Sequence, residues 1–146
     1  MDAANYGMSG AAAYRAVAGI DAEPKEFMKM AMDAARIFLL QAETAIAAGD
    51  RPAKAKALSS AAKVVEFMLG LSGTQRGPLS DRLASAYQYV LAAILKGNAW
   101  DDREAVAAGR FTVEQLAAVW RKMFPDVVGW DGIGDHVPLA GRENNA

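Results

Sequence analysis

Long stretches of the chain repeat apolar residues every three or four positions, the spacing that keeps side chains on one face of an α-helix. Proline and glycine, which mark helix starts and stops, are concentrated between these stretches. Helices are therefore predicted over residues 24–48, 52–71 and 78–96, with a short helical segment at 101–108 and a last helix at 112–124. This pattern predicts an all-α fold, an antiparallel up-down four-helix bundle with three long helices and a shorter final helix.

Individual residues set the predicted helix ends. Pro24 and Pro78 suit the first turn of a helix, because the N–H that proline lacks has no partner there. Gly49 can adopt the left-handed conformation that ends a helix, and Gly109 is expected to end the short segment. Thr112 is followed three residues later by a glutamine, the spacing of a capping box, which predicts that the last helix begins there.

The composition changes outside the helical region. Residues 1–13 are rich in glycine, alanine, serine and asparagine, and we expect a mobile N-terminal arm. Residues 14–124 form the predicted bundle, and residues 125–146, with several glycines, an irregular C-terminal tail. A chain of 146 residues fits one domain and can bury a core without disulfides or metals.

The long helices carry more apolar surface than one core stripe requires. The first helix has two adjacent apolar rows, one through Phe27 and Phe38 and one through Met28 and Leu39. The second row could pack against the fourth helix or a second copy of the chain, or it could line an exposed groove. We favour the groove, because a short fourth helix would cover only one side. Grooves of this kind bind amphipathic helices.

Candidate groove residues occur on all three long helices, and methionines among them would adapt to varied partner surfaces. Phe67 stands out, since it follows Ser60 and Lys63 on a line that should otherwise face water. Either row of each helix could face the core. The candidates are Met28, Met32 and Leu39 on the first helix, Phe67, Met68 and Leu71 on the second, and Tyr87, Leu91 and Ile94 on the third.

Other function classes find little support in the sequence. The net charge of -1 gives no electrostatic footprint for nucleic acid, and no apolar stretch is long enough to span a membrane. The chain has no cysteine, and its single histidine, His136, lies in the predicted tail. Phosphate-binding loops and calcium-loop spacings are missing. We therefore expect no enzyme activity, no cofactor and no metal, and the absence of a secretory signal places the chain in the cytoplasm.

Several segments, taken in order, resemble the FliS family of flagellar secretion chaperones. The family pattern begins with a tyrosine, continues to a proline and a mid-helix aspartate, and ends the first helix at Gly-Asp. The matching residues here are Tyr14, Pro24, Asp33 and Gly49-Asp50, and residues 83–90 and 114–120 are similar to the family's third and final helices. The resemblance covers residues 13–124. This chain departs from the pattern at Glu23, Met32 and Ala34, where the family commonly has serine, tyrosine and glycine.

The resemblance implies a cytoplasmic chaperone that binds the C-terminal segment of flagellin. That segment becomes helical around the bundle, premature polymerisation is prevented until export, and release can follow from competition at the export gate. It also implies that Tyr14 acts as a plug over the client site. An alternative role for Tyr14, to which we give equal weight, is a hydrophobic staple that fixes how the chain enters the first helix. The alternative function is a self-associating structural or regulatory adaptor, whose second apolar rows are buried in a homodimer.

Overall fold

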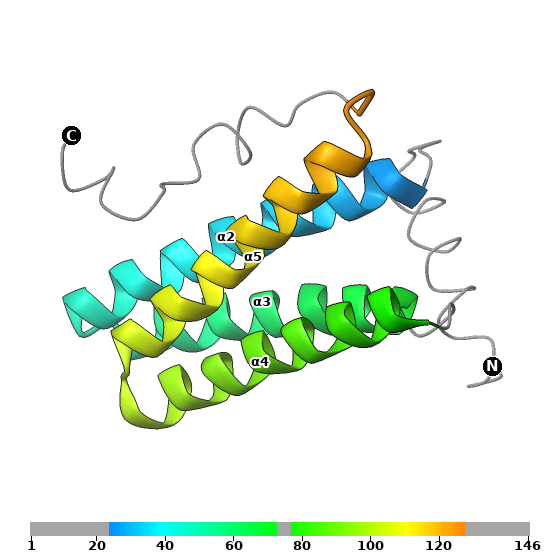
Figure 1. The fold of residues 1–146 in the computed structure, drawn as a ribbon. Coiled ribbons are helices and arrows are strands. Elements are labelled where there is room, and N and C mark those ends of the chain that lie inside the picture. The colour runs from blue at the N-terminus through cyan, green and yellow to red at the C-terminus, as the bar shows by residue number, and fades with distance from the viewer. Residues whose placement is uncertain (1–23, 73–76, 128–146) are drawn as a thin grey trace, which may run out of the picture.

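A computed structural model of the chain describes residues 24–72 and 77–127, and within these ranges it contains helices and turns only. The chain runs up and down along successive helices, so the predicted all-α bundle is confirmed (Figure 1). The predicted arm at residues 1–13 and the tail from residue 128 onward lie outside the described residues. The helices are α2 (Pro24–Ala48), α3 (Arg51–Ser72), α4 (Pro78–Trp100) and α5 (Arg103–Met123).

The four helices form a ring in which each packs against two neighbours. α2 and α4 both contact α3 on one side and α5 on the other. Side chains from all four helices meet in the centre, where burial of each large apolar side chain contributes about 1.5–3 kcal/mol. Val127, just after α5, is also buried against this core. The largest fully buried side chains include Phe27, Met32, Leu39, Leu58, Met68, Tyr87, Val90 and Val106.

The turn between α2 and α3 has the predicted glycine cap. Gly49 has a φ of 70°, and the amide of Asp50 donates to the carbonyl oxygen of Ala45 at 2.9 Å. The carboxylate of Asp50 then accepts from the amide of Ala53 at 3.1 Å, which satisfies one of the free amides at the start of α3. α3 therefore begins at Arg51, one residue before the predicted start.

The predicted boundaries around residues 96–112 are wrong. α4 continues through Gly97 to Trp100, and the two predicted pieces at 101–108 and 112–124 are one continuous helix of 21 residues. Asp102 caps this helix, since its carboxylate accepts from the amide of Ala105 at 3.0 Å. Thr112 does not cap a helix, because its hydroxyl donates to the carbonyl oxygen of Ala108 within α5. α5 is long enough to pack along both α2 and α4, so it is not confined to one side.

Gly97 lies inside α4 because α5 passes close to it. A Cβ atom added at this position would lie 2.3 Å from Cγ2 of Val106, far inside any real contact. At Gly109 the corresponding distance, to Cβ of Ala93, is 3.1 Å. Both glycines therefore allow α4 and α5 to approach each other, and neither ends a helix.

A buried lysine ties the turn between α4 and α5 to α3. The ammonium group of Lys54 donates to the carbonyl oxygen of Asn98 at 3.0 Å and forms an ion pair with Asp101. Asp101 has a φ of 52°, so the turn places this non-glycine residue in the left-handed region. The hydrogen bond from Lys54 lowers the pKa of the Asp101 carboxyl below its usual range.

This ion pair makes the stability of the bundle depend on pH. Because the pKa of Asp101 is lower in the folded chain, its contribution is present above the unfolded pKa and is lost as pH falls through the folded pKa. We expect the Asp101→Asn variant to show a flatter decline of unfolding free energy between roughly pH 5 and 2 in urea titrations. Glu66→Gln, at an exposed position outside the ion pairs of the described residues, is the control. Equal slopes for Asp101→Asn and the parent would contradict this assignment.

Candidate functional site

The seam between α2 and α5 is closed by a buried ionic cluster. The guanidinium group of Arg110 donates to Glu43 at 3.3 Å and to Glu114 at 3.0 Å. The two glutamates are only 7% and 5% exposed, so both depend on Arg110 for compensation of their charge. The hydrogen bond to Glu43 raises the pKa of Arg110. An ion pair between Lys25 and Asp126 joins the beginning of α2 to the turn after α5.

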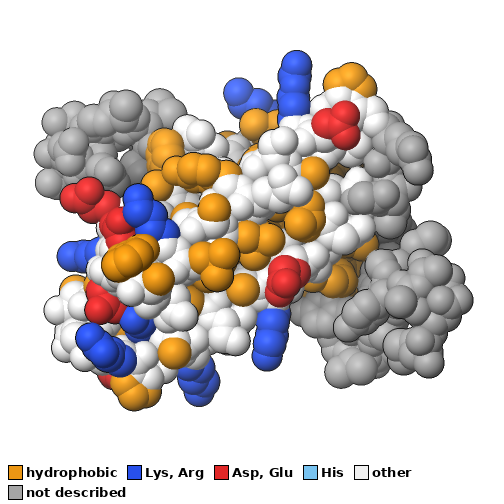
Figure 2. Space-filling view, turned by 90° about the horizontal axis from the view of Figure 1, so that it is seen from below, with side chains coloured by type: hydrophobic (Ala, Val, Ile, Leu, Met, Phe, Trp, Pro, Cys, Tyr) orange, Lys and Arg blue, Asp and Glu red, His pale blue; other side chains and the backbone are white. Residues whose placement is uncertain are grey.

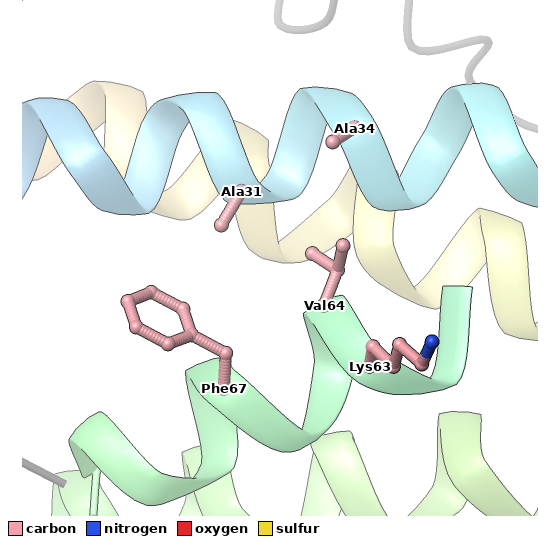
Figure 3. A pocket seen from close by; sticks show the side chains of 5 residues that line it. All are labelled: Ala31, Ala34, Lys63, Val64 and Phe67. Atoms are coloured by element: carbon pink, nitrogen blue, oxygen red, sulfur yellow. The ribbon is translucent and has the colours of Figure 1, made fainter. Parts of the chain in front are cut away.

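The seam between α2 and α3 is different, because it contains an open apolar hollow of about 240 Å³. Ala31 and Ala34 of α2 leave room for it, since their side chains end at Cβ. Figure 3 shows Val64 and Phe67 extending from α3 toward the space between the helices, with Lys63 beside Val64. The lining is therefore four apolar side chains and one lysine.

A second open hollow, of about 390 Å³, is lined by later residues of α2 together with Asp50 and Ala53, and shares no lining residue with the first. Ile37, one helical turn after Ala34, lines it and is 43% exposed. We call the two hollows together the α2–α3 groove. The second hollow is lined by Ile37, Leu40, Gln41, Thr44, Ala45, Ala48, Asp50 and Ala53.

Among the described residues predicted for partner binding, Phe67 alone lines this groove. Leu71 and Leu91 are half-buried against the core, and Tyr14 lies outside the described residues. The other six are 5% exposed or less and lie in the core between the helices, so their contact with a partner stays a prediction. These six are Met28, Met32, Leu39, Met68, Tyr87 and Ile94.

Tyr87 illustrates what the buried candidates do in the folded chain. Its side chain is fully buried, and its hydroxyl donates to Sδ of Met28 at 3.6 Å, a weak acceptor. Burial raises the pKa of Tyr87 to about 12. The side chain therefore holds α4 to α2 and is not presented to solvent.

Sequence reasoning missed most of the groove-lining residues. Ala31 and Ala34 belong to the row of α2 that was not chosen for the groove, although small residues at this spacing can leave a hollow. The signal that did point here was Phe67, an aromatic residue on a line shared with Lys63. The row through Met28 and Leu39 turned fully inward, and the other row is buried at Phe27 and Ala31 but reaches the surface at Ala34.

A further apolar surface lies on the side of the molecule formed by α3 and α4. Figure 2 shows hydrophobic side chains gathered over the middle of this face, among separate charged groups. Leu91 is half-buried, and Leu95, one turn later on α4, is 71% exposed. Neither residue lines a hollow of the α2–α3 groove.

Neither a metal site nor a membrane span is found among the described residues. No group of three or more histidine, aspartate or glutamate side chains in residues 24–72 and 77–127 could hold a metal ion. Across the same ranges, none of the helices combines the length and apolar character that a membrane span requires. The described part of the chain does present apolar surfaces, of the kind that can contact another polypeptide.

Comparison with known proteins agrees with this description. A sequence model of the family described as flagellar protein FliS matches residues 7–127. The flagellar secretion chaperone FliS of Salmonella typhimurium (strain LT2) is 29% identical over 126 residues. That match covers 82% of this chain and 93% of the Salmonella protein.

Proposed function

Because this chain belongs to the FliS family of flagellar secretion chaperones, we propose that it binds the C-terminal helical segment of flagellin and supports flagellin export. In this proposal the bound segment cannot polymerise prematurely. Binding takes place in the cytoplasm, and competition at the export gate releases the segment. The chaperone needs no cofactor for this, since binding and release are equilibria between protein surfaces.

The observation that carries the proposal is the α2–α3 groove. The residues of α2 that line its two hollows lie between Ala31 and Ala48, a stretch of about 25 Å at the rise of an α-helix. That length accommodates several turns of a guest helix, and most of the lining is apolar. An amphipathic helix laid in such a groove buries its apolar row against the lining.

Binding must also compensate for ordering the client. A disordered segment that folds on binding loses about 2–5 kcal/mol of the interaction energy to its own ordering. Apolar area removed from water returns about 25 cal/mol per Å². A client that extends over the groove and adjoining apolar faces can therefore bind with a net gain, whereas a short fragment of it would bind weakly.

The test is a titration of the purified full chain with a peptide from the C-terminal segment of flagellin of the same organism. We expect saturable binding by calorimetry, and a helical circular-dichroism signal larger than the sum of the separate components. A peptide of the same composition in scrambled order is the control. No binding to the native peptide, together with a doubled mass of the free chain in light scattering, would favour the self-associating adaptor instead.

A further inference from the structure

One lysine of α3 lines the α2–α3 groove, and a second lies on the same face of that helix. Lys63 of α3 lines the first hollow, and Lys56 lies seven residues earlier, two turns away on the same side of α3. Both lysines are exposed. Neither takes part in an ion pair among the described residues.

The residues of α2 that line the two hollows are uncharged. They include Ile37, Leu40, Gln41 and Thr44 in the second hollow and the two alanines in the first. The one carboxylate in the lining, Asp50, sits at the end of the groove and already accepts a hydrogen bond from the amide of Ala53. Among the lining residues the positive charge is therefore that of Lys63 on α3, and α2 contributes no cation to the lining.

We propose that the groove selects a guest helix with an acidic row beside its apolar row, in which two carboxylates seven residues apart face Lys56 and Lys63. This inference rests on the proposed function, because the guest is the client segment. Seven residues advance about 10.5 Å along any α-helix, so the spacing matches whether the guest runs parallel or antiparallel to α3. One large apolar side chain of the guest enters the hollow beside Ala31, Val64 and Phe67.

The two contacts have different tasks. The apolar side chain supplies burial, while the ion pairs set the register of the guest and disfavour helices with basic residues at those positions. A guest shifted by one turn would keep its apolar contact but move both carboxylates away from the lysines. The charge pattern therefore distinguishes one register, and one class of client, from others of equal hydrophobicity.

The experiment uses the full chain and the flagellin peptide described above. We expect the Lys56→Glu/Lys63→Glu variant to bind the peptide roughly 30-fold more weakly at low ionic strength, and this loss to shrink in high salt because the pairs are exposed. A peptide with lysines in place of its two carboxylates should bind this variant better than it binds the parent. Lys122→Glu, an exposed and unpaired position of α5, is the control and should leave affinity unchanged.

Several outcomes would overturn the inference. One is a flagellin peptide that binds the parent tightly while lacking carboxylates seven residues apart. Another is equal affinity of the parent for the native peptide and for one with glutamines at both positions, a result that does not depend on the folding of any protein variant. Binding of phosphatidylglycerol vesicles through the same lysines, with peptide affinity unchanged, would assign them to a lipid surface. If the parent binds no flagellin peptide at all, the proposed function itself fails.

Discussion

Replacing Arg110 with methionine should lower the free energy of unfolding by about 3 kcal/mol, one of the largest effects expected of a single substitution in this bundle. The variant leaves Glu43 and Glu114 buried at the α2–α5 seam without the cation that compensates them. An uncompensated buried charge costs about 3–5 kcal/mol of unfolding free energy. Because Arg110 itself is partly exposed, we expect a loss near the lower end of this range.

Urea denaturation followed by circular dichroism measures this effect. Arg103→Met, at an exposed position of the same helix, is the matched control and should cost less than about 0.5 kcal/mol. Adding Glu43→Leu and Glu114→Leu to Arg110→Met should restore most of the lost stability, since apolar groups of similar volume can replace a buried ion cluster. A loss below about 1 kcal/mol for Arg110→Met would mean that the two carboxylates reach water without the arginine.

Ala34→Glu should weaken binding of the flagellin peptide about 100-fold while leaving the free chain folded, a loss of about 2.7 kcal/mol. Ala34 lines the first hollow, so a glutamate there would occupy part of the space and place a carboxylate where the guest's apolar side chain docks. In the free chain Ala34 is only half-buried, and glutamate is a good helix former whose carboxylate can extend to solvent.

The matched control is Ala99→Glu, the same change at an exposed position of α4. Calorimetric titration should give the parent affinity for Ala99→Glu and a strongly reduced one for Ala34→Glu, with similar melting temperatures for both variants. Parent-like affinity of Ala34→Glu would show that the client binds elsewhere, and the apolar face of α3 and α4 would then be the next candidate.

The sequence identified the helices well where their ends have local causes. Pro78 and Gly49 act within one turn of the residues they affect, so the limits of α2 and the start of α4 were predicted correctly. Gly97 and Gly109 led to wrong helix ends in the prediction. A glycine that permits close helix packing looks the same in sequence as one that ends a helix. Only the contacts with Val106 and Ala93 distinguish the two cases, and these contacts join separate helices.

The candidate site was less accessible to sequence reasoning. Periodicity shows that α2 has two apolar rows, but it does not show how the helix is rotated about its axis. The rotation follows from packing of all four helices, which buries Met32 and Leu39 and leaves Ala34 at the surface. Arg110 and Glu43 are 67 residues apart in the chain, so no local pattern could have paired them.

The first hollow lies over the side chains that hold the helices together, and Ala31 belongs both to its lining and to the core. Ala34, Val64 and Lys63 reach the surface, whereas Met32, Val65 and Met68 lie fully buried behind them. On the proposed function, a guest would contact these outer side chains without displacing the fully buried ones, so that one chaperone molecule could serve several cargo molecules in succession. The outer side chains could then change with a changing client while the fully buried ones stay constant.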